Sequence, residues 1–126
     1  MQKLEKPVRK SGVAHFIAAA GYSAGGARRL WRESAFRKEV IGLAVLLALF
    51  AVVGASFAEF LGLAILSLIL LAVEALNTAI EELVDNASPG WSEFARSAKD
   101  MGSFAVMCLL VATGLYAGWV VLFSPV

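Results

Sequence analysis

The sequence is poor in the features that stabilise small soluble domains. It contains one cysteine, Cys108, so no intramolecular disulfide can form. Only 17% of its 126 residues are charged and 60% are hydrophobic, which is more apolar surface than a soluble domain of this size buries. The hydrophobicity and the net charge of +1 also exclude an intrinsically disordered chain. The composition therefore indicates a small integral membrane protein.

The common nucleotide-binding motifs are absent too. There is no GxxxxGK(S/T) phosphate loop, and Gly21, Gly25 and Gly26 do not form a GxGxxG pattern after a strand. The catalytic-loop and metal-binding signatures of protein kinases are also missing. Any nucleotide must therefore be bound by other means, and we expect no nucleic acid as a partner.

Three apolar runs predict three transmembrane helices. The runs cover 39–57, 58–84 and 101–124, and each is long enough to cross a bilayer at about 1.5 Å per residue. The second run carries carboxylates in its second half. A cytoplasmic loop over 85–100 is expected to join it to the third. The predicted fold is an all-α integral membrane protein that forms a single membrane domain over 1–126.

The first 38 residues are strongly basic, with nine of the eleven Lys and Arg residues. The positive-inside rule therefore places the N-terminus and the loop in the cytoplasm and the C-terminus on the periplasmic or extracellular side. We expect this basic segment, 1–38, to contain an amphipathic surface helix, with chain breaks at Gly21 and at Gly25-Gly26 before it. Its apolar or small residues recur at helical spacing: Ala27, Leu30, Trp31, Ser34 and Ala35.

Polar side chains recur at helical spacing along the second run. At about 100° per residue they lie on one narrow stripe of a helix, and ionisable groups at membrane depth mark functional sites. Two carboxylates suit Mg²⁺, and Lys99 with Asp100 would add a phosphate partner and a hydrogen-bond acceptor. The set fits phosphoryl transfer, a proton or cation relay, or a structural role, and the pattern does not choose between them. The stripe consists of Glu74, Asn77, Glu81 and Asp85.

Two strings of residues resemble the prokaryotic diacylglycerol kinase family. They are EALNTAIE at 74–81, continued to Asp85, and AKDMGS at 98–103, with shorter matches at 20–23 and 33–37. The resemblance covers nearly the whole chain. It implies a homotrimer in the bacterial inner membrane, with three transmembrane helices and an N-terminal surface helix in each subunit. It also implies transfer of the γ-phosphoryl group of MgATP to the hydroxyl of a membrane lipid.

The resemblance further implies roles for individual residues. Glu74 matches the catalytic base that takes the proton from the lipid hydroxyl, and Glu33 and Glu81 match the carboxylates that bind Mg²⁺. The residues that it implies for contact with ATP are His15, Tyr22, Glu33, Asn77, Glu81, Gly90, Trp91, Ser92, Lys99 and Asp100. Those that it implies for contact with the lipid are Ala19, Ala20, Arg28, Trp31, Glu74 and Ser103.

The sequence departs from the family pattern at two places. One residue fewer separates Trp31 from Glu33, which would turn Glu33 by about 100° on a continuous helix. The segment 86–92 contains Pro89-Gly90, which is typical of a turn. Diacylglycerol is the expected acceptor. The alternatives are undecaprenol, which similar proteins phosphorylate, and a non-enzymatic role in ion or proton handling.

Overall fold

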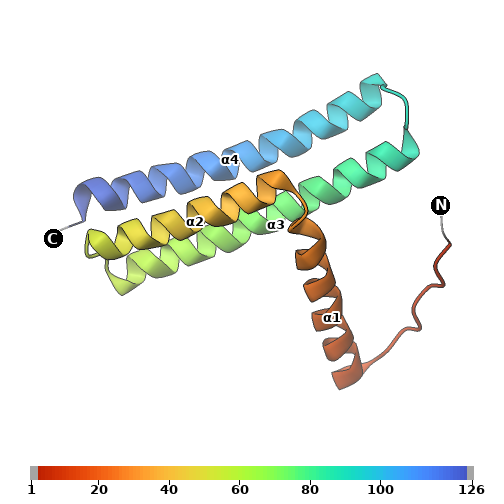
Figure 1. Cartoon of the computed structure of the whole chain (residues 1–126), viewed down its shortest axis with the longest axis horizontal. Coiled ribbons are helices and arrows are strands. Elements are labelled where there is room, and N and C mark those ends of the chain that lie inside the picture. Colours follow the sequence, from red (N-terminus) through yellow and green to blue (C-terminus); the bar gives the residue numbers. More distant parts are fainter. Residues whose placement is uncertain (1–2, 125–126) are drawn as a thin grey trace.

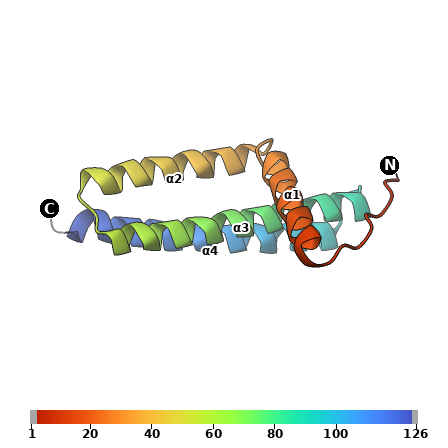
Figure 2. The ribbon, with the colours of Figure 1, turned by 90° about the horizontal axis from the view of Figure 1, so that it is seen from below.

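The computed structural model describes residues 3–124, and all of its regular structure is helical. The helices are α1 (Gly12–Leu30), α2 (Ser34–Val52), α3 (Phe57–Ala87) and α4 (Glu93–Phe123). The last three run alongside one another, and α1 projects away from the start of α2 (Figure 1). Figure 2 shows α2 on one side of the α3–α4 pair. The prediction of an all-α fold is therefore confirmed for the described residues.

Two apolar clusters join α2, α3 and α4 along their length. Burial of apolar side chains stabilises such contacts, and each cluster takes residues from α2, α3 and α4. The result is that α2 is attached to the α3–α4 pair at two levels. One cluster contains Phe50, Leu63, Ala117 and Val120, and the other contains Leu43, Leu70 and Val106.

The connection between α2 and α3 is a tight turn. Gly54 has a φ of +71°, a backbone conformation that residues with a Cβ atom rarely adopt. Helix α2 ends before Gly54. Ser56 then begins α3 through a capping box: its hydroxyl accepts from the Glu59 N–H at 3.2 Å, and the Glu59 carboxylate accepts from the Ser56 N–H at 2.7 Å. The first apolar helix therefore ends at Val52, earlier than the predicted 57.

The N-terminal region does not break at its glycines. Helix α1 runs continuously through Gly21, Gly25 and Gly26, and open space surrounds the Cα atom of each. The chain breaks that we expected at these positions are therefore wrong. Glycine lowers helix stability but does not end a helix by itself.

The helical spacing over 27–35 also misled the prediction, because the chain turns at 31–33 instead of continuing as a surface helix. The Trp31 carbonyl accepts a hydrogen bond from Arg37 Nη1 at 2.7 Å, and the Trp31 ring packs edge to face on Phe36. These contacts hold the corner between α1 and α2. The surface helix suggested by the sequence thus corresponds to α1, which ends at Leu30.

The connection expected over 85–100 is much shorter in the structure. Only 88–92 lies between helices, because α3 continues to Ala87 and α4 begins at Glu93. The Ser92 hydroxyl caps α4 by accepting from the Ala95 N–H at 3.1 Å. The charged residues of this region are therefore carried mainly on helices.

Helices α3 and α4 are each long and apolar enough to cross a membrane, judged by length and composition. Each has 31 residues, or about 46 Å at about 1.5 Å per residue, which exceeds the roughly 30 Å of a bilayer core. A helix of this length that crosses a bilayer upright extends beyond the hydrocarbon. Helix α2 is shorter, with 19 residues, and carries Arg37, Lys38 and Glu39 near its start.

A polar contact links α4 to the first turn of α3. The Tyr116 hydroxyl donates to the Glu59 carbonyl at 2.7 Å, and the Ser124 hydroxyl donates to the Glu59 carboxylate at 3.1 Å. The Tyr116 phenol lies against Gly62, where a Cβ atom would overlap it. Glycine at 62 therefore lets the two helices approach closely enough for this bond.

Replacement of Tyr116 by Phe tests this contact. The ring packing on Phe50 is kept, but one hydrogen bond is lost, so we expect the free energy of unfolding to fall by about 1 kcal/mol. Unfolding in detergent micelles, followed by circular dichroism, measures the change. The control is Tyr22→Phe, at a side chain that is 63% exposed, and equal stability of the two variants would contradict the prediction.

Candidate active site

Four carboxyl groups gather where the corner between α1 and α2 faces α3. Glu33 precedes α2 and Glu39 lies in its second turn, while Glu74 and Glu81 lie two turns apart on α3. The carboxyls of Glu39 and Glu74 lie close together, and Glu81 and Glu33 lie near Glu74. We call these four residues the carboxyl cluster.

Glu74 is the most buried member of the cluster, with 5% of its surface exposed. Glu33 and Glu81 are half-buried, so water can reach them. A carboxylate inside an apolar helix pair is costly unless it serves a function or has a partner. The cluster is therefore the strongest candidate for a reactive site in the described part of the chain.

Asn77 lies on the face of α3 that meets α4. Its side chain packs against Gly102, where an added Cβ would overlap the amide oxygen. The amide oxygen is buried and has no hydrogen-bond partner among residues 3–124. Gly102 thus creates the room in which Asn77 sits, and the unpaired oxygen can accept a bond from a ligand or from water.

Lys99 is held at the end of the helix pair nearest the α3–α4 connection. Its ammonium pairs with Asp85 at 2.5 Å and lies 5.9 Å from the centre of the Trp91 ring. Cation–π and ion-pair contacts of this kind fix the direction of a flexible lysine. Lys99, Trp91 and Asp85 therefore form a second group, beyond the carboxyl cluster along α3.

Arg29, on the last turn of α1, joins the corner to α3. Its Nη1 donates to Glu33 Oε1 at 2.7 Å, and its Nη2 donates to Glu82. These two bonds hold the pKa of the Arg29 guanidinium above its ordinary value, with Glu33 the larger cause. The guanidinium thus links a member of the carboxyl cluster to a neighbouring carboxylate on α3.

The structure brings together only part of the predicted site within one chain. Glu33, Glu74 and Glu81 meet in the carboxyl cluster, whereas α1 projects from the bundle (Figure 1) and none of its residues is buried. The predicted contacts on α1 therefore lie away from the cluster of the same chain. They are His15, Ala19, Ala20 and Tyr22, of which His15 and Tyr22 line a small hollow with the N-terminal segment.

The remaining predicted residues are near the surface. Arg28 is exposed on the last turn of α1, Trp31 is in the corner, and Asp100 and Ser103 are exposed on the first turns of α4. Gly90 and Ser92 lie in the connection 88–92, where the Ser88 and Ser92 hydroxyls are 3.0 Å apart. Among the described residues, none of them makes a hydrogen bond or an ion pair with the carboxyl cluster or with Lys99.

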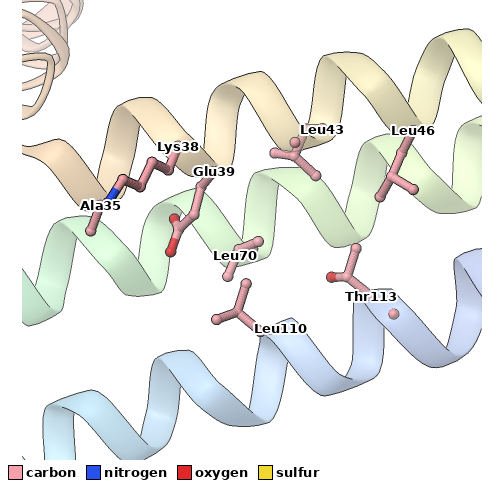
Figure 3. A pocket seen from close by; sticks show the side chains of 10 residues that line it. Ala35, Lys38, Glu39, Leu43, Leu46, Leu70, Leu110 and Thr113 are labelled. Carbon is pink, nitrogen blue, oxygen red and sulfur yellow. The ribbon is translucent and has the colours of Figure 1, made fainter.

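A mostly apolar cavity of about 540 Å³ lies between α2, α3 and α4 beside the cluster (Figure 3). Glu39 and Thr113 line it, and Figure 3 shows the Glu39 carboxyl pointing into the space between the helices. Glu39 Oε2 and Thr113 Oγ1 are buried and lack hydrogen-bond partners among residues 3–124. The apolar lining includes Leu43, Leu46, Leu70 and Leu110.

The sequence analysis missed three residues of this region: Glu39, Arg29 and Glu82. Glu39 was the last charged residue before an apolar run and was counted as the edge of a span. Glu33 and Glu39 lie close together in the sequence, before the same apolar run. This closeness is a weak signal that Glu39 belongs to the same site as Glu33. The pairing of Arg29 with Glu82 joins positions 53 residues apart, so no local pattern could have revealed it.

A divalent cation fits the carboxyl cluster as a partly open site. Among residues 3–124, no three acidic, His or Cys side chains converge tightly enough to hold a metal ion alone. Mg²⁺, however, commonly takes one or two carboxylates and completes its shell with phosphate oxygens and water. Glu33 and Glu81, both half-buried carboxylates near Glu74, are the residues that would supply such a donor pair.

Comparison with known proteins gives a consistent result. The family model for prokaryotic diacylglycerol kinase matches residues 21–122. A diacylglycerol kinase of Sinorhizobium sp is 53% identical over 119 residues, covering 94% of this chain and 87% of the relative. The diacylglycerol kinase of Escherichia coli strain K12 is 39% identical over 104 residues, covering 80% and 84%. One from Helicobacter pylori strain 26695 is 38% identical over 117 residues, covering 88% of each chain.

Replacement of Gly102 by Ala tests the contact between α4 and Asn77. The added methyl group overlaps the Asn77 amide, so the helices must separate or the amide must move, and we expect a loss of about 1–3 kcal/mol in the free energy of unfolding. The control is Gly25→Ala inside α1, where open space surrounds the position. Thermal unfolding in detergent compares the two, and a Gly102 variant as stable as its control would contradict the prediction.

Proposed function

Because the chain belongs to the prokaryotic diacylglycerol kinase family and is a membrane-bound lipid kinase, we propose that its carboxyl cluster transfers the γ-phosphoryl group of ATP to diacylglycerol. The products would be phosphatidic acid and ADP. The observation that carries the proposal is Glu74, a buried carboxyl near the carboxyls of Glu39, Glu33 and Glu81. Such a site can hold a proton acceptor and a cation side by side.

Glu74 acts as the general base in this proposal. As the primary hydroxyl oxygen of the lipid attacks the γ-phosphorus, a new P–O bond forms and the bond to the ADP oxygen breaks. The hydroxyl proton passes to the Glu74 carboxylate. A positioned base contributes roughly 10²–10⁴-fold to such a step, and the protein otherwise mainly positions groups and neutralises charge.

Glu33 and Glu81 would hold Mg²⁺ together with the phosphates. When bound, the ion supplies positive charge that offsets the negative charge of the phosphoryl oxygens. The protein residues provide the pair of hard oxygen donors and keep them beside the base. Half-burial of both carboxylates supports this role, because a phosphate can approach them from water.

The nucleotide would lie along the part of the α3–α4 pair that extends past the start of α2. Lys99 supplies a positive charge for the phosphates, and the unpaired amide oxygen of Asn77 supplies an acceptor. Trp91, 71% exposed beside Lys99, offers a flat apolar surface. His15, Tyr22, Gly90, Ser92 and Asp100 complete the proposed contacts with ATP.

The lipid would approach from the membrane side of the cluster. The cavity of about 540 Å³ is mostly apolar and has the Glu39 carboxyl on its wall, next to Glu74. An acyl chain fits this lining, because it buries apolar surface there. Ala19, Ala20, Arg28, Trp31 and Ser103 are the other residues that we propose to border the lipid.

We place the protein in the bacterial inner membrane with α2, α3 and α4 as spans, the N-terminus in the cytoplasm and the C-terminus outside. The 19 residues of α2 reach about 28 Å, close to the thickness of a bilayer core. Its charged residues all lie at one end, where they can stay in the interface. That end also holds α1 and most Lys and Arg residues, in agreement with the positive-inside rule.

The functional unit in this proposal is a homotrimer. One chain leaves Glu33 and Glu81 partly open, and the predicted ATP contacts on α1 lie away from its own cluster. Neighbouring chains can cover the open side and keep lipid away from the carboxylates. Gly114 and Gly118 on α4 have open space around them, and small residues at this spacing allow helices to pack closely.

Replacement of Glu74 by Gln tests the proposed base. The side chain keeps its shape but cannot take the proton, so we expect the rate of phosphatidic acid formation to fall at least about 100-fold while nucleotide binding is retained. The measurement uses purified protein in mixed micelles with labelled ATP, and calorimetry for the nucleotide. The control is Glu5→Gln in the exposed N-terminal segment. A Glu74 variant with wild-type activity would exclude this role.

The choice of lipid is tested separately, with the wild-type protein. Diacylglycerol and undecaprenol are supplied in matched micelles with MgATP, and the labelled lipid product is quantified. We expect phosphorylation of diacylglycerol, since every relative compared above carries that name. Activity confined to the polyprenol would overturn the proposed acceptor and leave the kinase chemistry in place.

A further inference from the structure

Arg29 is bonded to two carboxylates at once. One guanidinium nitrogen donates to Glu33 Oε1 at 2.7 Å, and the other donates to Glu82 Oε1. The three residues come from different places: the last turn of α1, the corner and the exposed face of α3. The planar guanidinium fork can hold two carboxylates in a fixed relation, so this contact ties the corner to α3.

The corner itself is held by the contacts of Trp31 with Phe36 and Arg37, but these contacts do not fix the Glu33 carboxylate. Helix α1 has no buried residue, and Arg29 is the one hydrogen-bond partner of the Glu33 carboxylate among residues 3–124. Although Glu33 is the N-cap residue of α2, its side chain makes no capping bond. Without Arg29, the Glu33 carboxylate would be free to turn toward water.

The position of Glu82 determines which carboxylates the contact of Arg29 occupies. We call this contact, from Glu33 through Arg29 to Glu82, the tether. Glu82 follows Glu81 on α3, and successive helical residues point about 100° apart. Arg29 can therefore bind Glu82 while Glu81 stays available. It also contacts Glu33 through Oε1 alone, which leaves Oε2 for another cation. The contact thus places Glu33 beside the turn of α3 that carries Glu81 and Glu82, without occupying all the donor atoms of Glu33 and Glu81.

We propose that Arg29, anchored by Glu82, is a positioning residue that holds the Glu33 carboxylate beside Glu81 before a divalent cation binds. This inference rests on the proposed function, in which Glu33 and Glu81 are the metal-binding pair. The positive charge of Arg29 also offsets the repulsion between Glu33, Glu81 and Glu82 when no metal is bound. The three side chains are 37–53% exposed, and exposed ion pairs add little to global stability. The tether therefore acts mainly on the position of Glu33.

The first experiment measures metal binding without turnover. Full-length protein in detergent is titrated with Mn²⁺ in the presence of a non-hydrolysable ATP analogue, and free Mn²⁺ is followed by electron paramagnetic resonance. We expect Arg29→Gln and Glu82→Gln each to weaken Mn²⁺ binding by about tenfold, because loss of a residue that orients a metal ligand commonly costs 10–100-fold. Arg29→Lys should fall between them and the wild type, since an ammonium cannot fork across both carboxylates.

The control is Arg32→Gln, which removes the same charge from an exposed corner residue three positions away. It should bind Mn²⁺ within about twofold of the wild type if position, and not overall charge, is the cause. Melting temperatures of all four variants should stay near that of the wild type. A loss of Mn²⁺ affinity as large in Arg32→Gln as in Arg29→Gln would overturn the proposal in favour of a general charge effect.

The second experiment measures the distance between α1 and α3 in metal-free protein, which tests whether the tether forms before metal binds. Spin labels at Ala24 on α1 and Leu83 on α3, both exposed, report the distance between the helices in samples diluted with unlabelled chain. We expect a narrow distance distribution in the wild type and a clearly broader one in Arg29→Gln and in Glu82→Gln. An unchanged distribution together with unchanged Mn²⁺ affinity would overturn the inference and leave the proposed function standing.

Failure of the proposed function would look different. If the wild-type protein binds no Mn²⁺, or if Glu81→Gln binds it as well as the wild type, the proposed metal pair is wrong. The role assigned to Arg29 would then be overturned as well, even if the spin-label distances change on mutation. The two sets of measurements therefore separate a wrong metal site from a wrong tether.

Discussion

Repulsion among the carboxylates near the corner between α1 and α2 constrains the rest of the molecule. Glu39 and Glu74 lie close together, and Glu33 and Glu81 lie near Glu74. Like charges at this spacing repel unless a proton or a cation is shared between them. The cluster is tolerated because water reaches its outer members and because Arg29 places a positive charge at its edge. The same arrangement suits a cofactor that brings positive charge.

The length of α3 and α4 explains how so short a chain can be a kinase. Each helix has 31 residues, which is more than the hydrocarbon of a bilayer requires. One pair of helices can therefore have one part in the hydrocarbon and one part beyond it. Its apolar part packs with α2, and the pair extends beyond the start of α2 (Figure 1). The end of the pair that adjoins the 88–92 connection carries Asp85 and Lys99. Close packing at Gly102 against Asn77 keeps the two helices together at the level of the cluster. No separate nucleotide-binding domain is needed in such an arrangement.

The attachment of α1 differs from that of the other helices. Helices α2, α3 and α4 are joined by buried apolar clusters, whereas α1 is held by ion pairs to Glu33 and Glu82 that water can reach. Contacts of that kind are weaker and respond to charge. The position of α1 therefore depends on a few charged contacts, whereas the three-helix part depends on apolar burial.

Local sequence was sufficient to predict the helices, the polar stripe on α3 and the family. Helical periodicity and apolar runs depend on residues a few positions apart, so they can be read along the chain. The same local signals misplaced the helix ends. They missed the corner at 31–33, where contacts of Trp31 with Phe36 and Arg37 compete with helical spacing. They also missed that most of 85–100 is helical, since α3 reaches Ala87 and α4 begins at Glu93.

The sequence by itself determined that this is an all-helical lipid kinase with Glu74, Asn77 and Glu81 on one stripe of a helix. Only the tertiary structure decided that Glu39 faces Glu74, that Arg29 bridges Glu33 and Glu82, and that His15 and Tyr22 lie away from their own cluster. The reason is physical. A stripe follows from the pitch of one helix, whereas these contacts depend on how helices meet across up to 53 residues of chain.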